Sequence, residues 1–326
     1  MRRRLLAWPE LGPVLALLLT WLFFAAAAGP AFRSLDGTAA WLNAAAPLGI
    51  LATAVGVLMI GGEFDLSVGS VIGVSGMGVM LLTTELGWPI GAALAAVLLL
   101  AAAIGLANGL LVVRTGVPSF LVTLGSLFVL RGLTIALGRR LTGRTQLGGL
   151  DEVAGYDRWR ALFAFDLGPF SATIAWWLAL LLLAAWLLRR TRTGNWIFAA
   201  GGGAEAARNA GVPVRRVKVG LFIATALAAA LVGIIQAVRF TGADALRGEG
   251  QEFRAIVAAV IGGTLLTGGY GSALGIACGA LIFGMVQQGI VITGVDADWF
   301  QVFLGAMLIG AVLVNDAMRR RALTAA

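Results

Sequence analysis

The hydrophobic positions of this chain form long runs that are separated by short clusters of glycine, proline and charged residues. A membrane-spanning helix needs about 20 mostly apolar residues, and runs of that length predict roughly ten spans. They lie near 12–31, 38–60, 67–84, 88–112, 117–138, 170–188, 214–239, 252–267, 272–293 and 298–317. The eighth is short, and the third and fifth contain glycines or an arginine, so these three are expected to be broken or re-entrant. The pattern predicts an all-α polytopic membrane protein that forms one transmembrane domain over residues 1–326.

Composition supports this class and removes several others. Hydrophobic residues make up 60% of the chain, charged residues 12%, and the mean hydropathy is +0.93, which leaves too little polar surface for a soluble protein. The chain contains no histidine and one cysteine, Cys278. Histidine acid–base chemistry, His or multi-Cys metal sites and an intrachain disulfide are therefore excluded. We expect no catalytic, cofactor-binding or metal-binding residues in this chain.

Basic residues gather beside the predicted spans, which explains the net charge of +8 better than a nucleic-acid-binding surface does. If both termini share one side, that side carries 14 of the 24 basic residues and few acids. They are Arg2, Arg3, Arg4, Arg114, Arg189, Arg190, Arg192, Arg208, Arg215, Arg216, Lys218, Arg319, Arg320 and Arg321. The positive-inside rule then predicts cytoplasmic termini, a cytoplasmic loop at 189–218 and an outer loop at 139–169. The first apolar run lacks a clear small-residue cleavage site, so we expect it to be retained as a helix.

The cytoplasmic loop contains AEAARNAG, residues 204–211, which has the composition of a short helix. Glu205 lies in its first turn, Arg208 follows one turn later, and Gly211 stands where a left-handed residue would end the helix before Pro213. A helix of about two turns is not stable alone in water, so it must dock on something if it is ordered. A groove in a partner protein and the chain's own bundle are the two alternatives.

Two carboxylates, Glu63 and Asp65, interrupt apolar sequence at the join of the second and third spans, in MIGGEFDLSVGSVIG. Acids at membrane depth usually face a cavity or a partner. The neighbouring glycines and serines suit a helix break that lines a cavity. The alternative is an interfacial loop in which both acids cap the third helix.

A related pattern returns later in the chain. Residues 60–73 and 261–275 share IGG, a short polar insert, then GS, two residues and a glycine, and the inserts differ by one residue. Such similarity predicts an internal repeat, a common device of transporters, with the ligand path at the interface of the halves. Both breaks are expected on the cytoplasmic side.

Four ordered segments carry a family resemblance. They are GGEFDLSVGS at 61–70, LANGLLVVRTGVPSFLVTLGSLFVLRGL at 106–133, TRTGNWIFAAGGGAEAARNAGV at 191–212 and GEGQEFRAIVAAVIGGTLLTGGYGS at 248–272. They resemble, in the same order, segments of the inner-membrane permease subunits of ABC importers for ribose, xylose, arabinose and other simple sugars. The likeness covers residues from about 40 to 317 and is far more specific than any one of its segments.

The resemblance implies the ABC importer permease fold and a coupling helix that docks on a separate ATP-binding subunit. Its residues here are Ala204, Glu205, Ala206, Ala207, Arg208, Asn209 and Gly211. The chain has no G-x-x-x-x-G-K-[ST] loop, and its only lysine, Lys218, lies in RRVKVG, so ATP and Mg²⁺ are expected on the partner ATPase. The resemblance also implies a homodimer in the bacterial inner (plasma) membrane, a periplasmic or extracellular sugar-binding protein as partner, and no nucleic acid.

A sugar needs hydrogen-bond partners along its route, and polar residues within the predicted spans are the candidates. They are Asn43, Glu63, Asp65, Ser67, Asn108, Thr123, Ser126, Gln236, Gln287 and Gln288. The alternative for each is that it only holds helices together, as intramembrane polar residues often do. The loop at 139–169, with Tyr156 and Trp159, is either a contact for the binding protein or a tether.

The chain departs from the family pattern at several positions. Phe198 stands in place of the usual Tyr, Gly203 where Asn is common, and Arg254 where Asp is frequent. Arg254 reverses a charge near the outer mouth, so the substrate cannot be carried over from the family. Glu63 and Phe64 occupy the place of one small or aliphatic residue and mark a subfamily.

Three other interpretations stay open. An ion-coupled secondary transporter or channel would also use broken helices and buried acids such as Glu63 or Asp65. An intramembrane enzyme would need a constellation of reactive groups, of which the sequence offers only that pair. Among ABC permeases, the branched-chain amino acid importers share the general architecture and a similar coupling loop.

Overall fold

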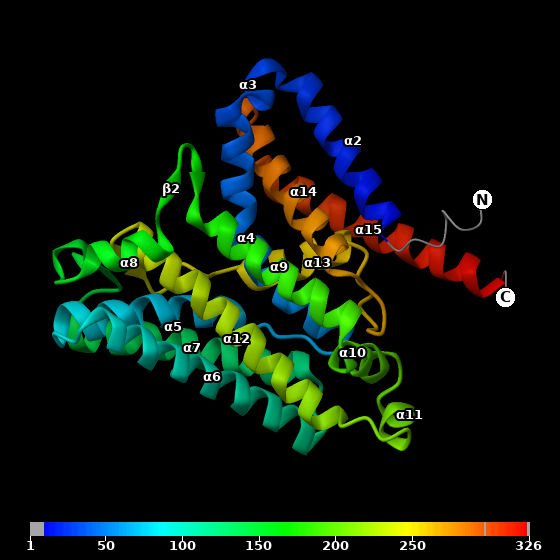
Figure 1. The fold of residues 1–326 in the computed structure, drawn as a ribbon, viewed down its shortest axis with the longest axis horizontal. Coiled ribbons are helices and arrows are strands. Elements are labelled where there is room, and N and C mark those ends of the chain that lie inside the picture. Colours follow the sequence, from blue (N-terminus) through cyan, green and yellow to red (C-terminus); the bar gives the residue numbers. More distant parts are fainter. Residues whose placement is uncertain (1–9, 297, 325–326) are drawn as a thin grey trace.

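The computed structural model describes residues 10–296 and 298–324 and is predominantly helical (Figure 1). Its α-helices are α2 (Leu11–Ala27), α3 (Gly29–Arg33), α4 (Leu35–Ile60), α5 (Val68–Met80), α6 (Ile90–Thr115), α7 (Ser119–Thr142), α8 (Tyr156–Phe163), α9 (Ala172–Arg190), α10 (Arg192–Gly202), α11 (Ala204–Asn209), α12 (Val214–Arg239), α13 (Gln251–Ile261), α14 (Ala273–Ile292) and α15 (Trp299–Thr324). The arginines predicted at positions 2–4 of the cytoplasmic side lie outside the described residues.

Short irregular elements complete the chain. A π-helix, η1 (Leu81–Glu85), continues α5, and a 3-10 helix, η2 (Leu150–Glu152), follows α7. The strands pair antiparallel in two small sheets: β1 (Gln146–Gly148) with β4 (Gly242–Asp244), and β2 (Asp166–Leu167) with β3 (Phe170–Ser171).

Each predicted membrane segment contains a helix, and seven helices in the described chain are long and apolar enough to cross a membrane. They are Leu35–Ile60, Val68–Glu85, Ile90–Thr115, Ser119–Thr142, Ala172–Arg190, Val214–Arg239 and Ala273–Ile292. Two further apolar helices, Leu11–Ala27 and Trp299–Gly310, are shorter. The all-α polytopic fold class is confirmed, whereas the count of about ten spans stays a prediction.

The three segments that were expected to be broken or re-entrant differ from one another in the structure. The eighth is a half-length helix, because α13 has 11 residues and ends at Ile261. The third changes from α- to π-helix at Leu81. The fifth, α7, is one continuous helix of 24 residues, so the expectation of a break there was wrong. Its arginine, Arg131, is accommodated by pairing with Glu249 and Glu252.

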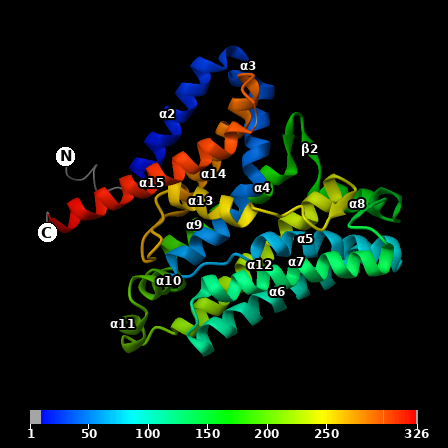
Figure 2. The ribbon, with the colours of Figure 1, turned by 180° about the vertical axis from the view of Figure 1, so that it is seen from behind.

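The helices form two groups that share α12 and α4 as their central contacts. In both views, α5, α6, α7 and α12 run side by side, while α2, α4, α14 and α15 form the second group (Figures 1 and 2). The buried core includes Ile50 of α4, Phe222 of α12 and Ile276 of α14. Glycines allow close approach within it: a Cβ at Gly284 of α14 would overlap the carbonyl oxygen of Trp41 in α4.

The two ends of the bundle carry different structures. The helices α9 and α12 connect the end that holds α8 to the end that holds α10 and α11, and α12, with 26 residues, is about 39 Å long (Figure 1).

The loop predicted at 139–169 begins within α7, which extends to Thr142, and the rest of it is folded onto the end of α12. Its strand β1 pairs with β4, and the Tyr156 hydroxyl donates to the Val238 carbonyl at 2.8 Å. Burial raises the pKa of Tyr156, and the nearby Arg160 guanidinium partly opposes that shift.

The two glycine-containing breaks share one backbone geometry. After Ile60, the N–H groups of residues 61, 62 and 63 donate to the carbonyls of residues 57, 59 and 58. After Ile261, the N–H groups of residues 262, 263 and 264 donate to the carbonyls of residues 258, 260 and 259. The second glycine of each pair is left-handed, with φ +81° at Gly62 and +84° at Gly263. The repeated sequence pattern thus corresponds to a repeated helix ending.

Candidate translocation and coupling site

The break between α4 and α5 is buried and centred on Asp65. Its side chain has no exposed surface, although it carries a carboxylate in an apolar bundle. One carboxylate oxygen accepts from the N–H and the hydroxyl of Ser67 at 2.9 and 2.6 Å, and the other accepts from the Thr225 hydroxyl at 2.6 Å. Because Ser67 directly precedes α5 and Thr225 belongs to α12, Asp65 fixes the start of one helix against the side of another.

Helices α6 and α7 contribute to the same network. The Asn108 amide donates to the Ser67 hydroxyl at 3.0 Å, and the Thr123 hydroxyl accepts from the Leu66 N–H at 3.0 Å. Four predicted path residues, Asp65, Ser67, Asn108 and Thr123, therefore meet in one place. In this conformation their hydrogen bonds hold helices together, which is the alternative that the sequence left open.

Glu63, the other predicted acid, forms an ion pair with Lys218 near the start of α12. Both side chains are largely buried, at 11% and 16% exposure. The sequence assigned Lys218 to the basic cytoplasmic side and did not predict this partner. A signal was present, because Val214, Val217 and Leu221 place a buried stripe beside it on α12.

Sequence reasoning also missed two hydroxyls that complete the network. Thr225 lies within a run of alanine and leucine, and Ser119 begins α7, where its hydroxyl accepts from the Phe64 N–H at 3.0 Å. Neither residue is charged, and neither has a charged residue directly beside it in the sequence, so only the three-dimensional packing reveals its role.

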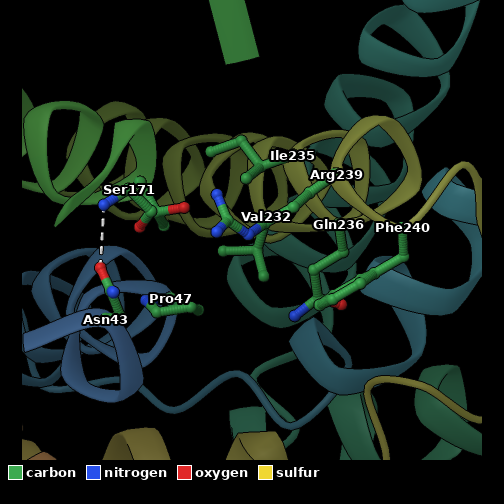
Figure 3. Close-up of a pocket in the computed structure, with 9 residues that line it drawn as sticks. Asn43, Pro47, Ser171, Val232, Ile235, Gln236, Arg239 and Phe240 are labelled. Carbon is green, nitrogen blue, oxygen red and sulfur yellow. Dashed lines mark hydrogen bonds between the residues drawn. The ribbon is translucent and has the colours of Figure 1, made fainter. Parts of the chain in front are cut away.

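A separate cavity of about 120 Å³ lies between α4, α9 and α12 and contains two of the predicted path residues (Figure 3). Gln236 and Arg239 of α12 line it, together with Asn43 of α4. The Asn43 side chain is already engaged, since it donates to the Pro169 carbonyl at 2.8 Å and accepts from the Ser171 N–H at 2.9 Å. The Gln236 side-chain oxygen is buried and has no hydrogen-bond partner within residues 10–296 and 298–324, so it is free to accept one.

The remaining path candidates lie elsewhere. Ser126 is half-buried on α7, and Gln287 and Gln288 are half-buried on α14. In the described part of the chain, the structure brings these three neither into the Asp65 network nor into the cavity.

A charged cluster that the sequence did not predict lies at the start of α13. Arg131 of α7 contacts Glu249 at 3.0 Å and Glu252 at 3.6 Å. The Glu252 side chain is only 3% exposed, so α13 begins with a buried carboxylate that needs this guanidinium. Arg254, the departure from the family pattern, is half-buried on the same helix.

The predicted short helix is present as α11, in the loop between α9 and α12. Ala207 is buried and packs with Ala200 of α10 and Val214 of α12, whereas Glu205 and Arg208 are exposed. Gly211 ends the helix as predicted.

The end of α11 matches a left-handed glycine cap. Gly211 has φ +85°, its N–H donates to the Arg208 carbonyl, and the Val212 N–H donates to the Ala207 carbonyl, both at 3.0 Å. The helix therefore rests on its own bundle through one face, and its opposite face, with Ala206 and Asn209, is open to a partner.

Known proteins match most of the chain. A family model described as "Branched-chain amino acid transport system / permease component" matches residues 37–312. The ribose import permease protein RbsC of Escherichia coli (strain K12) is 34% identical over 272 residues, or 82% of this chain and 81% of the relative. The xylose transport system permease protein XylH of the same strain is 31% identical over 361 residues, or 94% and 92%. No solved structure matches the chain.

Two further relatives are also named as permease proteins. The probable ABC transporter permease protein YphD of Escherichia coli (strain K12) is 36% identical over 314 residues, or 96% of this chain and 91% of the relative. The autoinducer 2 import system permease protein LsrD of Photorhabdus laumondii is 33% identical over 270 residues, or 82% and 79%. The chain belongs to the branched-chain amino acid transport system / permease component family, and it is a multi-pass membrane permease of the ABC importer type, a transporter subunit and not an enzyme.

Proposed function

We propose that this chain moves a monosaccharide or a similar small polar solute across the bacterial plasma membrane, driven by a separate ABC ATPase. The observation that carries the proposal is the short helix α11, which presents the exposed Glu205 and Arg208 at one end of the bundle while Ala207 anchors it. A docking helix must combine an anchored face with a free one, and α11 has both.

The proposed mechanism uses two copies of the chain. Two ATPase subunits hold the two α11 helices in the cytoplasm, and a solute-binding protein delivers the substrate on the other side. When ATP binding brings the ATPases together, the α11 helices act as levers and the permease chains rock between two access states. ATP and Mg²⁺ belong to the partner ATPase in this scheme.

The assignment of a sugar as substrate rests on relatives named for ribose import, xylose transport and autoinducer 2 import. Ribose and xylose are small, hydroxyl-rich solutes, which need hydrogen-bond acceptors and donors along the route. Gln236 offers an unsatisfied buried acceptor in the cavity beside Arg239, and these two are the residues that we place on the route.

Docking is tested by co-purification of the ATPase subunit encoded beside this chain. Glu205→Arg and Ala206→Trp change the exposed face of α11 and are expected to abolish recovery of the ATPase. The matched control is Asp157→Arg, which makes the same charge change in the first turn of the exposed helix α8, at the opposite end of the bundle. Normal recovery with both α11 variants would contradict the proposal.

A branched-chain amino acid is the second candidate substrate, because the matching family model carries that description. The two candidate substrates are distinguished by measuring which solute binds to the solute-binding protein that is encoded beside this chain. Competition by ribose or xylose, with none by leucine or isoleucine, is the expected result, and the reverse pattern selects the second candidate.

A further inference from the structure

The C-terminal end of α10 lies directly against both glycine-containing breaks. Gly201 stands beside Gly62, which follows α4, and beside Gly268 and Gly269, which precede α14. The two breaks also contact each other, because the Gly269 N–H donates to the Ile60 carbonyl at 2.8 Å. Three segments that are far apart in the sequence therefore meet at one point.

These contacts join backbone to backbone and leave no room for a side chain. A Cβ at Gly201 would overlap the Ile60 carbonyl oxygen and lie 2.7 Å from the Gly269 nitrogen. A Cβ at Gly268 would lie 2.7 Å from the Gly62 Cα atom. A side chain can change rotamer and absorb a displacement, whereas packed backbone segments transmit it.

The same segment is attached to the docking helix. Only Gly203 separates α10 from α11, and Ala200, one residue before Gly201, is buried against Ala207 of α11. A displacement of α11 therefore reaches Gly201 through the next turn of the chain and through a packed contact.

We propose that Gly201, with Gly62, Gly268 and Gly269, forms a backbone junction that passes a displacement of α10 and α11 to both breaks at once. The inference deepens the proposed function, since it rests on α11 receiving force from an ATPase. Under this proposal, both repeated helix pairs, α4–α5 and α13–α14, are displaced through this one junction. Gly201 is thus a positioning residue for transport and has no contact with the solute.

The first test adds one methyl group at three successive positions. Gly201→Ala places a Cβ inside the junction, Gly202→Ala places one at an ordinary 3.9 Å from the Gly269 Cα atom, and Gly203→Ala meets only the Ala206 Cβ, at 3.9 Å. Each variant is purified with the ATPase and assayed for ATPase recovery, ATP hydrolysis and solute uptake.

Gly201→Ala is expected to keep the ATPase subunit, because the exposed face of α11 is unchanged, yet to lose about tenfold or more in solute taken up per ATP hydrolysed. Gly202→Ala and Gly203→Ala are expected to stay within about twofold of wild type. Wild-type coupling in Gly201→Ala would overturn the junction while leaving α11 docking intact. Docking is tested separately with Glu205→Arg and Ala206→Trp, so a failure of the backbone junction can be distinguished from a failure of α11 docking.

A second measurement does not depend on folding of the Gly201 variant. Spin labels at the exposed positions Ala210, directly after α11, and Leu266 report the distance between α11 and the second break, in complexes with one labelled chain. The native Cys278 is buried, so the label is directed to the introduced cysteines. A label at Ala210 in both copies reports how far the two α11 helices move.

On ATP binding, the distance between the two Ala210 labels is expected to change, while the Ala210–Leu266 distance within one chain stays constant. A change in the Ala210–Leu266 distance as large as that between the two copies would show that α11 and the second break move independently, which overturns the proposal.

Discussion

The two breaks have the same helix ending but differ in the side-chain contacts that fix them. After α4, acidic and hydroxyl side chains anchor the break: Asp65 binds Ser67 and Thr225, and Glu63 pairs with Lys218. After α13, the position that corresponds to Glu63 is Thr264, whose buried hydroxyl has no hydrogen-bond partner in the described ranges.

The second break is held by close packing of glycine backbone. The comparison shows that the sequence IGG determines the shape of the ending, while the residues that follow determine what it is attached to. Both breaks contact the backbone of α10 at Gly201, and the first break is in addition bound to α6, α7 and α12 through polar groups. Removal of polar groups should therefore damage the first break, and added methyl groups should damage contacts at the junction.

The largest expected effect is at Asp65. Asp65→Ala leaves the N–H and the hydroxyl of Ser67 without their acceptor in a buried site, while the Thr225 hydroxyl keeps the Phe222 carbonyl at 2.9 Å, and the loss is about 3 kcal/mol of unfolding free energy. The matched variant at the second break, Thr264→Val, is expected to change stability by less than about 1 kcal/mol, because its hydroxyl has no partner to lose. Denaturant titration in detergent measures both, and equal losses would refute the comparison.

The next effect is at the ion pair. Lys218→Met leaves the Glu63 carboxylate buried without its cation, and we expect a loss of about 2 kcal/mol. The double variant with Glu63→Gln should recover most of it, since the two single effects are coupled. Additive losses in this double-mutant cycle, measured by thermal unfolding, would mean that the pair contributes nothing at the first break.

A smaller effect compares equivalent glycines. Gly62→Ala and Gly263→Ala both force alanine into a left-handed conformation, which costs about 1 kcal/mol. At Gly62 the new Cβ also meets the Gly201 backbone, 3.1 Å from its Cα atom, whereas at Gly263 it meets the Cγ atom of Pro13 at 3.3 Å, the ring atom that moves when a proline ring changes pucker. Gly62→Ala should be the more destabilising of the two by roughly another 1 kcal/mol of unfolding free energy. The reverse order in denaturant titration would contradict the claim that the contact at Gly62 is the tighter one.

The smallest effect supplies a baseline from a glycine cap outside both breaks. Gly211→Ala at the end of α11 is expected to cost about 1 kcal/mol, from its left-handed conformation alone. Gly220→Ala, in α12, has ordinary helical geometry and open space around its Cβ within the described chain, so it should be neutral or slightly stabilising. Equal losses of unfolding free energy at Gly220 and Gly211 would show that the cost at Gly211 does not come from its left-handed conformation.

Much of the architecture could be predicted because it depends on local sequence. The bounds of α12, predicted at 214–239, agree with the structure because Pro213 and Arg239 mark its two ends. The end of α13 was predicted too late, at 267, because the apolar count continued through Leu265 and Leu266 and overlooked the glycine cap after Ile261. Local signals thus locate helices well, and cap geometry corrects their ends.

The partners of the candidate site could not be predicted in the same way. Asp65 stood out because it is charged, but Thr225 lies 160 residues later within an alanine-rich helix, and only packing brings the two together. The polar groups at Asn108 and Thr123 were predicted as path residues, whereas in this conformation each serves a helix contact. The sequence identifies polar groups within the membrane and leaves open which of them face a solute.

The most direct measurement of the central claim is uptake of radiolabelled ribose or xylose into proteoliposomes that contain this chain and are supplied with the binding protein encoded beside it. The account predicts uptake against a gradient only when the ATPase subunit and ATP are both present, and none when α11 carries Glu205→Arg. Concentrative uptake by the chain alone, driven by a proton or sodium gradient, would contradict it.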